Sequence, residues 1–132
     1  MTLQNRLNGK VAIVHPIEQL SLTLSDMVQS FGPETKILLV TGQSTPQDVA
    51  AFVADYNPNL LLLAENYSAG YPKKGEGIPS LTEIKKTNPS LPVLMVSGGP
   101  EHQGRALEAG ANGYLPQVVT RVALEPVLRQ YL

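Results

Sequence analysis

The chain has 132 residues, a formal net charge of −1 and no cysteine, a length that suits one domain with a single core and leaves no room for a second. The balanced charge offers no basic field for nucleic acid or an anionic membrane, and the lack of cysteine removes disulfides, thiol nucleophiles and thiolate metal sites. Because no apolar run approaches the ~20 residues that cross a bilayer and no signal segment is recognised, we expect a soluble cytoplasmic protein with no direct contact with nucleic acid or membrane.

Five short apolar segments predict the strands of a parallel sheet. They are Lys10–Val14, Ile37–Val40, Leu60–Leu63, Pro92–Val96 and the shorter Gly113–Pro116. Runs that are apolar on both faces are typical of central strands in parallel sheets. We therefore expect a polar arm at residues 1–9 followed by one domain over residues 10–132.

Helical patterns alternate with these segments. The first places apolar residues on one stripe between Ile17 and Phe31 and is stopped by Gly32. The second has the clearest start, because Thr45 can cap it and Asp48, three residues on, can complete a capping box.

Three more helical patterns follow in the second half of the chain. The third is expected to start at Ser80, with Glu83 completing a capping box. The fourth runs from about Pro100 to Ala109 and ends at a glycine suited to a left-handed stop. The fifth starts at about Thr120, and Pro126 within it predicts a distorted first turn.

Strands and helices that alternate over short connections predict a doubly wound α/β fold with helices on both faces of the sheet. In such folds the functional crevice lies at the carboxyl ends of the strands. One segment, Glu65–Pro79, has no periodicity and reaches the length at which loops are commonly functional.

Three stretches, PNLLLLAE, PVLMVSGG and GANGYLPQ, carry a resemblance to a known family. Nearly the whole chain, from about Gly9 onward, resembles the receiver domain of two-component response regulators. The resemblance implies a flavodoxin-like (CheY-like) sheet of five strands in the order 2-1-3-4-5, with five helices. It also implies a magnesium site formed by an acid pair after the first strand and an aspartate after the third, which accepts phosphate. A hydroxyl residue and a lysine, after the fourth and fifth strands, complete the family's site.

Most of these groups are replaced in this chain. The acid pair falls on His15 and Pro16, and the phosphoacceptor falls on Ala64. The lysine falls on Gln117, so only the hydroxyl, on Ser97, is kept. Carboxylates hold magnesium in sites of this kind, and an alanine methyl cannot form an acyl phosphate. We therefore expect a degenerate pseudo-receiver that is not an enzyme and uses no metal or other cofactor.

In receivers, the face formed by the fourth helix, fifth strand and fifth helix commonly mediates dimerisation or partner contact. The aromatic that rearranges on activation of such domains is matched by Tyr114, and Val118, Val119 and Val122 follow it. These four residues form a candidate interface for an output domain, a histidine-kinase pathway component or a second copy of the chain. The alternative is that the valines only cover the edge of the sheet.

The sequence thus predicts signalling through protein contacts without phosphorylation. The alternative function is a small-molecule or anion sensor that uses the vacated pocket. Glu65 is either a displaced acid or a solvated loop residue, and we expect the second because strand side chains alternate in direction. His15 is a metal ligand, a pH sensor or, as we favour, structural. Ser97 lacks the preceding glycine of a nucleophile elbow, which argues against a hydrolase.

Overall fold

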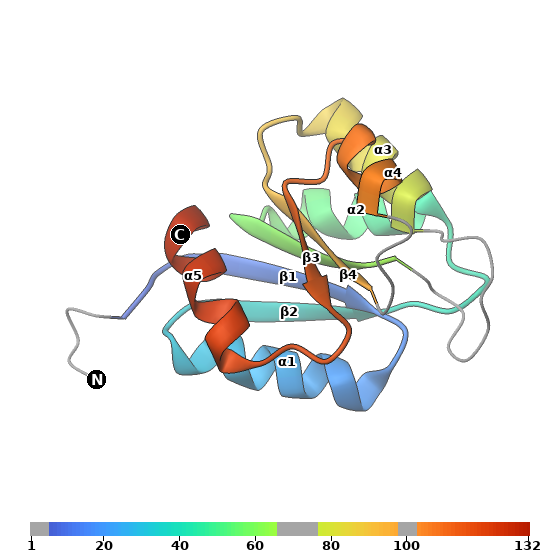
Figure 1. Cartoon of the computed structure of the whole chain (residues 1–132). Helices are drawn as coiled ribbons and strands as arrows, with labels where there is room; N and C mark the ends of the chain where they lie inside the picture. Colours follow the sequence, from blue (N-terminus) through green and yellow to red (C-terminus); the bar gives the residue numbers. More distant parts are fainter. Residues whose placement is uncertain (1–5, 66–76, 98–102) are drawn as a thin grey trace.

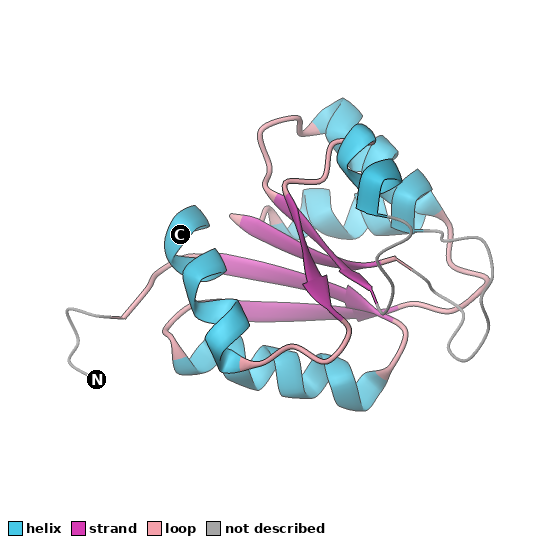
Figure 2. Ribbon diagram, in the orientation of Figure 1, coloured by secondary structure: helices cyan, strands magenta, loops and turns pink. Residues whose placement is uncertain are grey.

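The apolar segments of the sequence form one parallel sheet covered by helices on both faces (Figures 1 and 2). The computed structural model describes residues 6–65, 77–97 and 103–132. In these three ranges the elements are β1 (Lys10–His15), α1 (Glu18–Ser30), β2 (Glu34–Leu39), α2 (Pro46–Tyr56), β3 (Leu60–Ala64), α3 (Gly77–Thr87), β4 (Val93–Ser97), α4 (Gln103–Glu108), β5 (Gly113–Pro116) and α5 (Arg121–Tyr131). The strands pair in the order β2-β1-β3-β4-β5, which confirms the predicted fold and strand order.

An apolar core lies on each face of the sheet because successive strand side chains point in opposite directions. In β3, Leu61 and Leu63 join the core under α2, α3 and α4, whereas Leu60 and Leu62 join the core under α1 and α5. All four are fully buried, and each such leucine contributes about 2 kcal/mol by burial. Figure 1 shows α1 and α5 together on one side of the sheet. We call these two sides the α1/α5 face and the α2–α4 face.

Local capping sets the start of two helices as the sequence predicts. Thr45 and Asp48 form the expected capping box. The Asp48 N–H donates to the Thr45 hydroxyl oxygen with an N···O distance of 3.1 Å, and the Thr45 N–H donates to the Asp48 carboxylate with an N···O distance of 3.0 Å. Thr120 caps α5 by accepting a bond from the Ala123 N–H. The predicted distortion of the first turn of α5 is not found, since the Leu124 N–H still bonds to the Thr120 carbonyl at 3.0 Å. Pro126 comes after that turn and leaves it intact.

Two other predicted boundaries are wrong. The third helix is already formed at Gly77, the first described residue after the gap, and Ser80 is fully buried inside it, so the predicted capping box at Ser80 does not form. The second strand begins earlier than the apolar run, because Glu34 pairs with Lys10 of β1 and extends the ladder. Side-chain hydrophobicity does not report such backbone pairing.

The region of the fourth helix is described only from residue 103. Its helical part, Gln103–Glu108, ends ahead of Gly110, whose φ of +110° confirms the predicted left-handed stop. Residues 98–102 and 66–76, which hold the start of this predicted helix and most of the Glu65–Pro79 segment, lie outside the described residues. Among the helices that the structure describes, none is long and apolar enough to span a bilayer.

Candidate functional site

The carboxyl ends of the strands bring the residues predicted from the sequence to one edge of the sheet. Val14 pairs with Leu63, one residue before His15 and Ala64 respectively. Ser97 is the last residue of β4 and pairs with Pro116, which directly precedes Gln117. In a parallel sheet the carboxyl ends of the strands lie at the same edge. The edge is therefore common to these residues, but their side chains divide between the two faces.

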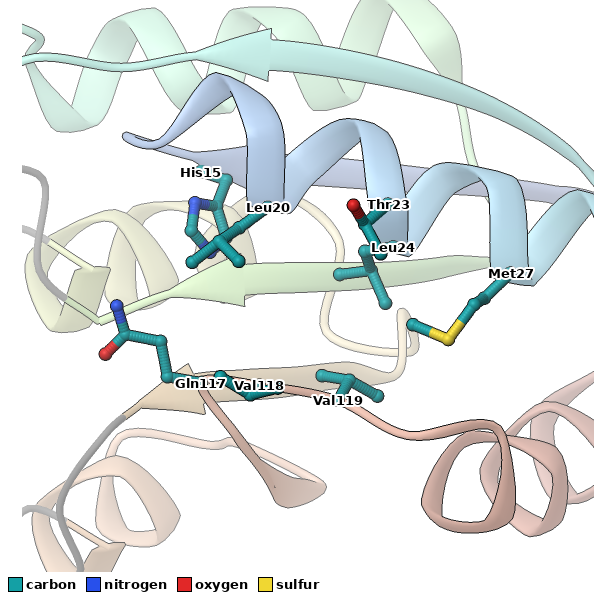
Figure 3. Close-up of a pocket in the computed structure, with 8 residues that line it drawn as sticks. All are labelled: His15, Leu20, Thr23, Leu24, Met27, Gln117, Val118 and Val119. Carbon is teal, nitrogen blue, oxygen red and sulfur yellow. The ribbon is translucent and has the colours of Figure 1, made fainter.

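On the α1/α5 face, His15 and Gln117 line the same small pocket (Figure 3). Its walls come from α1 and from the segment that follows β5, and its volume is about 30 Å³. The lining residues are His15, Leu20, Thr23, Leu24, Met27, Gln117, Val118 and Val119. A space of this size has room for ordered water. Among these lining residues only His15 can carry a charge, and it does so only when its ring is protonated.

His15 is held in its neutral form by its surroundings. The side chain is 3% exposed, and its Nδ1 accepts a hydrogen bond of 3.0 Å from the Ile17 N–H. A ring nitrogen that accepts such a bond carries no proton. Burial lowers the pKa of His15 below its ordinary value, because desolvation penalises the charged imidazolium.

The residues that the resemblance matches to metal positions do not fit magnesium. His15, Pro16 and Ala64 supply no carboxylate, and this ion is bound through oxygen ligands in such sites. Within residues 6–65, 77–97 and 103–132, no group of three or more His, Asp or Glu side chains could hold a metal ion. These three positions therefore offer no ligand set for magnesium.

On the α2–α4 face, a buried carboxylate joins the ends of three strands. Glu65 is 7% exposed, so the expectation of a solvated loop residue is wrong. Its Oε2 accepts a hydrogen bond of 2.5 Å from the Tyr114 hydroxyl, and its Oε1 accepts one of 3.3 Å from the Ser97 hydroxyl. The reason is backbone pairing: the Glu65 N–H bonds to the Val96 carbonyl at 3.0 Å, which continues the ladder one residue beyond β3. Alternation then turns the side chain away from the face of Ala64 and into the domain.

The sequence contains the three residues of this cluster, but their proximity follows only once the register of the strands is known. Glu65, Ser97 and Tyr114 each occupy a position of the same parity as the residues of the α2–α4 core. A carboxylate and two hydroxyls at adjacent strand ends are natural hydrogen-bond partners. Without the pairing of the strands, nothing in the sequence places them at the same level.

Gly77 brings the backbone of α3 close to the end of β3. Its N–H donates to the Glu65 carbonyl at 2.9 Å. A Cβ on Gly77 would lie 2.4 Å from the Ala64 carbonyl oxygen and 2.7 Å from the Glu65 Cα. Because both are backbone atoms that cannot easily move away, this close approach requires glycine.

The candidate interface is smaller than the sequence suggests. Val118 and Val122 are 70% and 86% exposed, whereas Val119 is buried in the α1/α5 core. Tyr114 is half-buried against the α2–α4 core and turns its hydroxyl toward Glu65. Val118 and Val122 are therefore the members of the predicted patch that offer apolar surface to a partner.

This architecture, with its edge of strand-end residues, is the fold of the receiver domains of response regulators. The receiver domain of NtrX from Brucella abortus is 24% identical, with a TM-score of 0.76 over 92% of this chain and 97% of that one. Chemotaxis protein CheY4 from Vibrio cholerae is 17% identical, with a TM-score of 0.76 over 96% of this chain and 100% of that one.

A longer NtrX structure from Brucella abortus is 23% identical with a TM-score of 0.77, and this chain spans 28% of its length. No family model matches the sequence, and neither does any curated protein. The similarity to solved structures establishes the fold, while the function has to be argued from the site.

Proposed function

We propose that this chain is a pseudo-receiver, which transmits a signal through protein contacts without accepting phosphate. The observation that carries the proposal is Ala64. It ends β3 at the position that matches the family's phosphoacceptor, and its side chain is a buried methyl group. A methyl group has no lone pair with which to attack a phosphoryl donor, so the covalent step of the family has no nucleophile at this position.

The surroundings of Ala64 support the same conclusion. Phosphoryl transfer needs positive charge to stabilise the oxygens of the moving group. At the matching positions this chain has the neutral amide of Gln117 and the buried His15, whose pKa is lowered by desolvation. Neither can supply the charge that a lysine and a bound magnesium ion supply together.

Glu65 is a carboxylate close to this position, but its geometry does not make it a replacement acceptor. Alternation sends its side chain to the face opposite that of Ala64, and its oxygens accept bonds from Tyr114 and Ser97. A carboxylate that is engaged by hydroxyl donors is a weaker nucleophile and less accessible to a donor. Its arrangement is that of a structural group.

The alternative function, a sensor of small molecules or anions, finds no support in the described part of the pocket. The space beside His15 and Gln117 has a volume of about 30 Å³, whereas sites for small molecules typically occupy ~300–1,000 Å³. The small volume of this pocket favours protein contact as the means of transmission. The exposed Val118 and Val122 are the proposed contact residues, toward an output domain, a histidine-kinase pathway component or a second copy of the chain.

Incubation with acetyl phosphate and magnesium ions tests the proposal. We expect the intact mass of the protein to stay unchanged, because the acceptor and the charges that assist transfer are absent. An increase of one phosphoryl group that is lost in alkali would overturn the proposal. If that adduct vanished in Glu65→Gln, the acceptor would be Glu65.

A matched variant shows whether the replaced residues are the cause. Combining His15→Asp, Pro16→Asp, Ala64→Asp and Gln117→Lys rebuilds the family's set on this scaffold. We expect this variant to gain the alkali-labile phosphoryl group under conditions in which the wild-type chain does not. A folded variant without that gain would mean that other features of the edge also block the reaction.

A further inference from the structure

We propose that the Glu65 carboxylate is an internal latch that holds the Tyr114 ring inside the domain and ties together the ends of β3, β4 and β5. The latch is the set of hydrogen bonds from Tyr114 and Ser97 to Glu65. It concerns how the β5 edge of the sheet is fixed. It therefore goes beyond the proposed function and stands whether or not the domain accepts phosphate.

The register of the sheet assembles the latch. β3 and β4 pair in step, so that Glu65, just beyond β3, lies beside Ser97 at the end of β4. Tyr114 pairs with Met95, two residues before Ser97, and its side chain points to the same face. A tyrosine is long enough to span that offset along the sheet, and its hydroxyl reaches the carboxylate.

Burial makes this contact costly to break. The Tyr114 hydroxyl donates to a Glu65 carboxyl oxygen at 2.5 Å, and a buried polar group needs such a partner. The carboxylate is 7% exposed, so little water is available to replace a donor that leaves. Outward rotation of the Tyr114 ring would remove a donor from a buried carboxylate, which is unfavourable. The ring is therefore held inward.

The fixed and the movable parts of the latch are distinct. The Glu65 backbone is bonded on both sides, through its N–H to Val96 and through its carbonyl to Gly77. β5, which carries Tyr114, is a strand of four residues at the edge of the sheet and pairs with β4 alone among the described strands. The fixed Glu65 backbone thus anchors β5, which is the shortest strand of the sheet.

The latch connects the interior to the exposed surface. β5 ends at Pro116, and the chain then passes through Val118 to the first turn of α5, which holds Val122. Both valines are strongly exposed. By fixing Tyr114, Glu65 fixes the strand that leads into this surface, so that the surface keeps one arrangement without a covalent event.

The experiment follows the Tyr114 ring directly in the intact chain. Glu65→Leu fills the space but accepts no hydrogen bond, and Glu65→Gln keeps an acceptor of similar size without the charge. Tyrosine ring resonances are recorded by NMR, with Tyr114→Phe for assignment, and ring nitration by tetranitromethane is mapped by mass spectrometry. Tyr56 and Tyr131 are internal controls, because neither contacts Glu65 among the described hydrogen bonds.

We expect Glu65→Leu to shift the Tyr114 resonances and to raise the nitration rate at Tyr114 about tenfold, the factor that corresponds to losing one hydrogen bond to a charged group. Glu65→Gln should give a smaller change in the same direction, and the two control tyrosines should not respond. If Glu65→Leu failed to fold, Glu65→Gln and Ser97→Ala would carry the test. Tyr114 resonances and nitration that stay at wild-type values in every folded variant would overturn the latch.

Discussion

At the scale of single residues, burial decides what the polar groups of this edge can do. His15 illustrates this, because a solvated histidine titrates near pH 6.5 whereas this one sits in an apolar wall and accepts a bond from the Ile17 N–H. A proton on Nδ1 would break that bond and place a charge in a pocket lined mainly by Leu24, Met27 and other uncharged residues. The imidazole accepts a hydrogen bond at the start of α1, and a purely structural role for it stays a prediction.

This environment predicts a loss of stability in acid. The folded pKa of His15 lies below the unfolded value of 6.5, so between the two values the unfolded chain binds more protons. The contribution of His15 is therefore complete above pH 6.5 and declines as the pH falls from there toward the folded pKa. Urea unfolding midpoints at about pH 7.5 and about pH 5.5 measure the effect.

The variant His15→Asn isolates this contribution, because an asparagine oxygen can accept the Ile17 N–H without titrating. We expect its midpoint to fall less than that of the wild-type chain on acidification. His102→Asn, at the only other histidine of the sequence, is the control. If the urea unfolding midpoints of the wild-type chain and of His15→Asn changed equally with pH, His15 would have its ordinary pKa in the folded state.

At the scale of elements, the junction between β3 and α3 is set by close backbone approach. Gly77→Ala would place a methyl group 2.4 Å from the Ala64 carbonyl oxygen. We expect it to lower the free energy of unfolding by about 1–3 kcal/mol, the typical cost of overpacking. Urea unfolding gives the value, and the NMR resonances of Glu65 report whether the strand end moves.

Gly104→Ala is the matched control within α4. A Cβ there meets nothing within 4 Å, and alanine is a better helix former than glycine by ~0.5–1 kcal/mol. Gly77→Ala should therefore lower the free energy of unfolding, whereas Gly104→Ala should raise it. Equal effects would mean that the approach of Gly77 to β3 is not a tight constraint.

At the scale of the whole molecule, the two edges of the sheet differ in the apolar surface that they carry. The β5 edge leads to Val118 and Val122, which are 70% and 86% exposed. Leu39, at the end of β2 on the opposite edge, is 44% exposed. If two copies of the chain associate through the β5 edge, a charge placed there should separate them.

We expect the weight-average mass from light scattering to rise with concentration for the wild-type chain. Val122→Asp should weaken this self-association by roughly tenfold or more, the effect of losing a central apolar contact. Leu39→Asp, which adds the same charge at the other edge, should leave it unchanged. A wild-type mass that stays monomeric at every concentration would contradict self-association through this surface.

The sequence by itself determined the alternation of elements. Four consecutive leucines in β3 and the Thr45–Asp48 capping box are local features, and each acts through burial or through bonds within a few residues. The sequence also shows that His15, Pro16 and Ala64 follow Val14 and Leu63, and that these residues replace the carboxylates of a receiver stays our proposal. Local chemistry was sufficient for these conclusions.

Only the tertiary structure decided where the strand-end side chains point and which of them meet. Pairing beyond β3 turned Glu65 inward to Ser97 and Tyr114, partners 32 and 49 residues away in the chain. Packing under α1 and α5 buried Val119 and left Val122 exposed, although both are valines in the same short stretch. These outcomes depend on register and on contacts between distant segments, which a one-dimensional pattern of residue types does not contain.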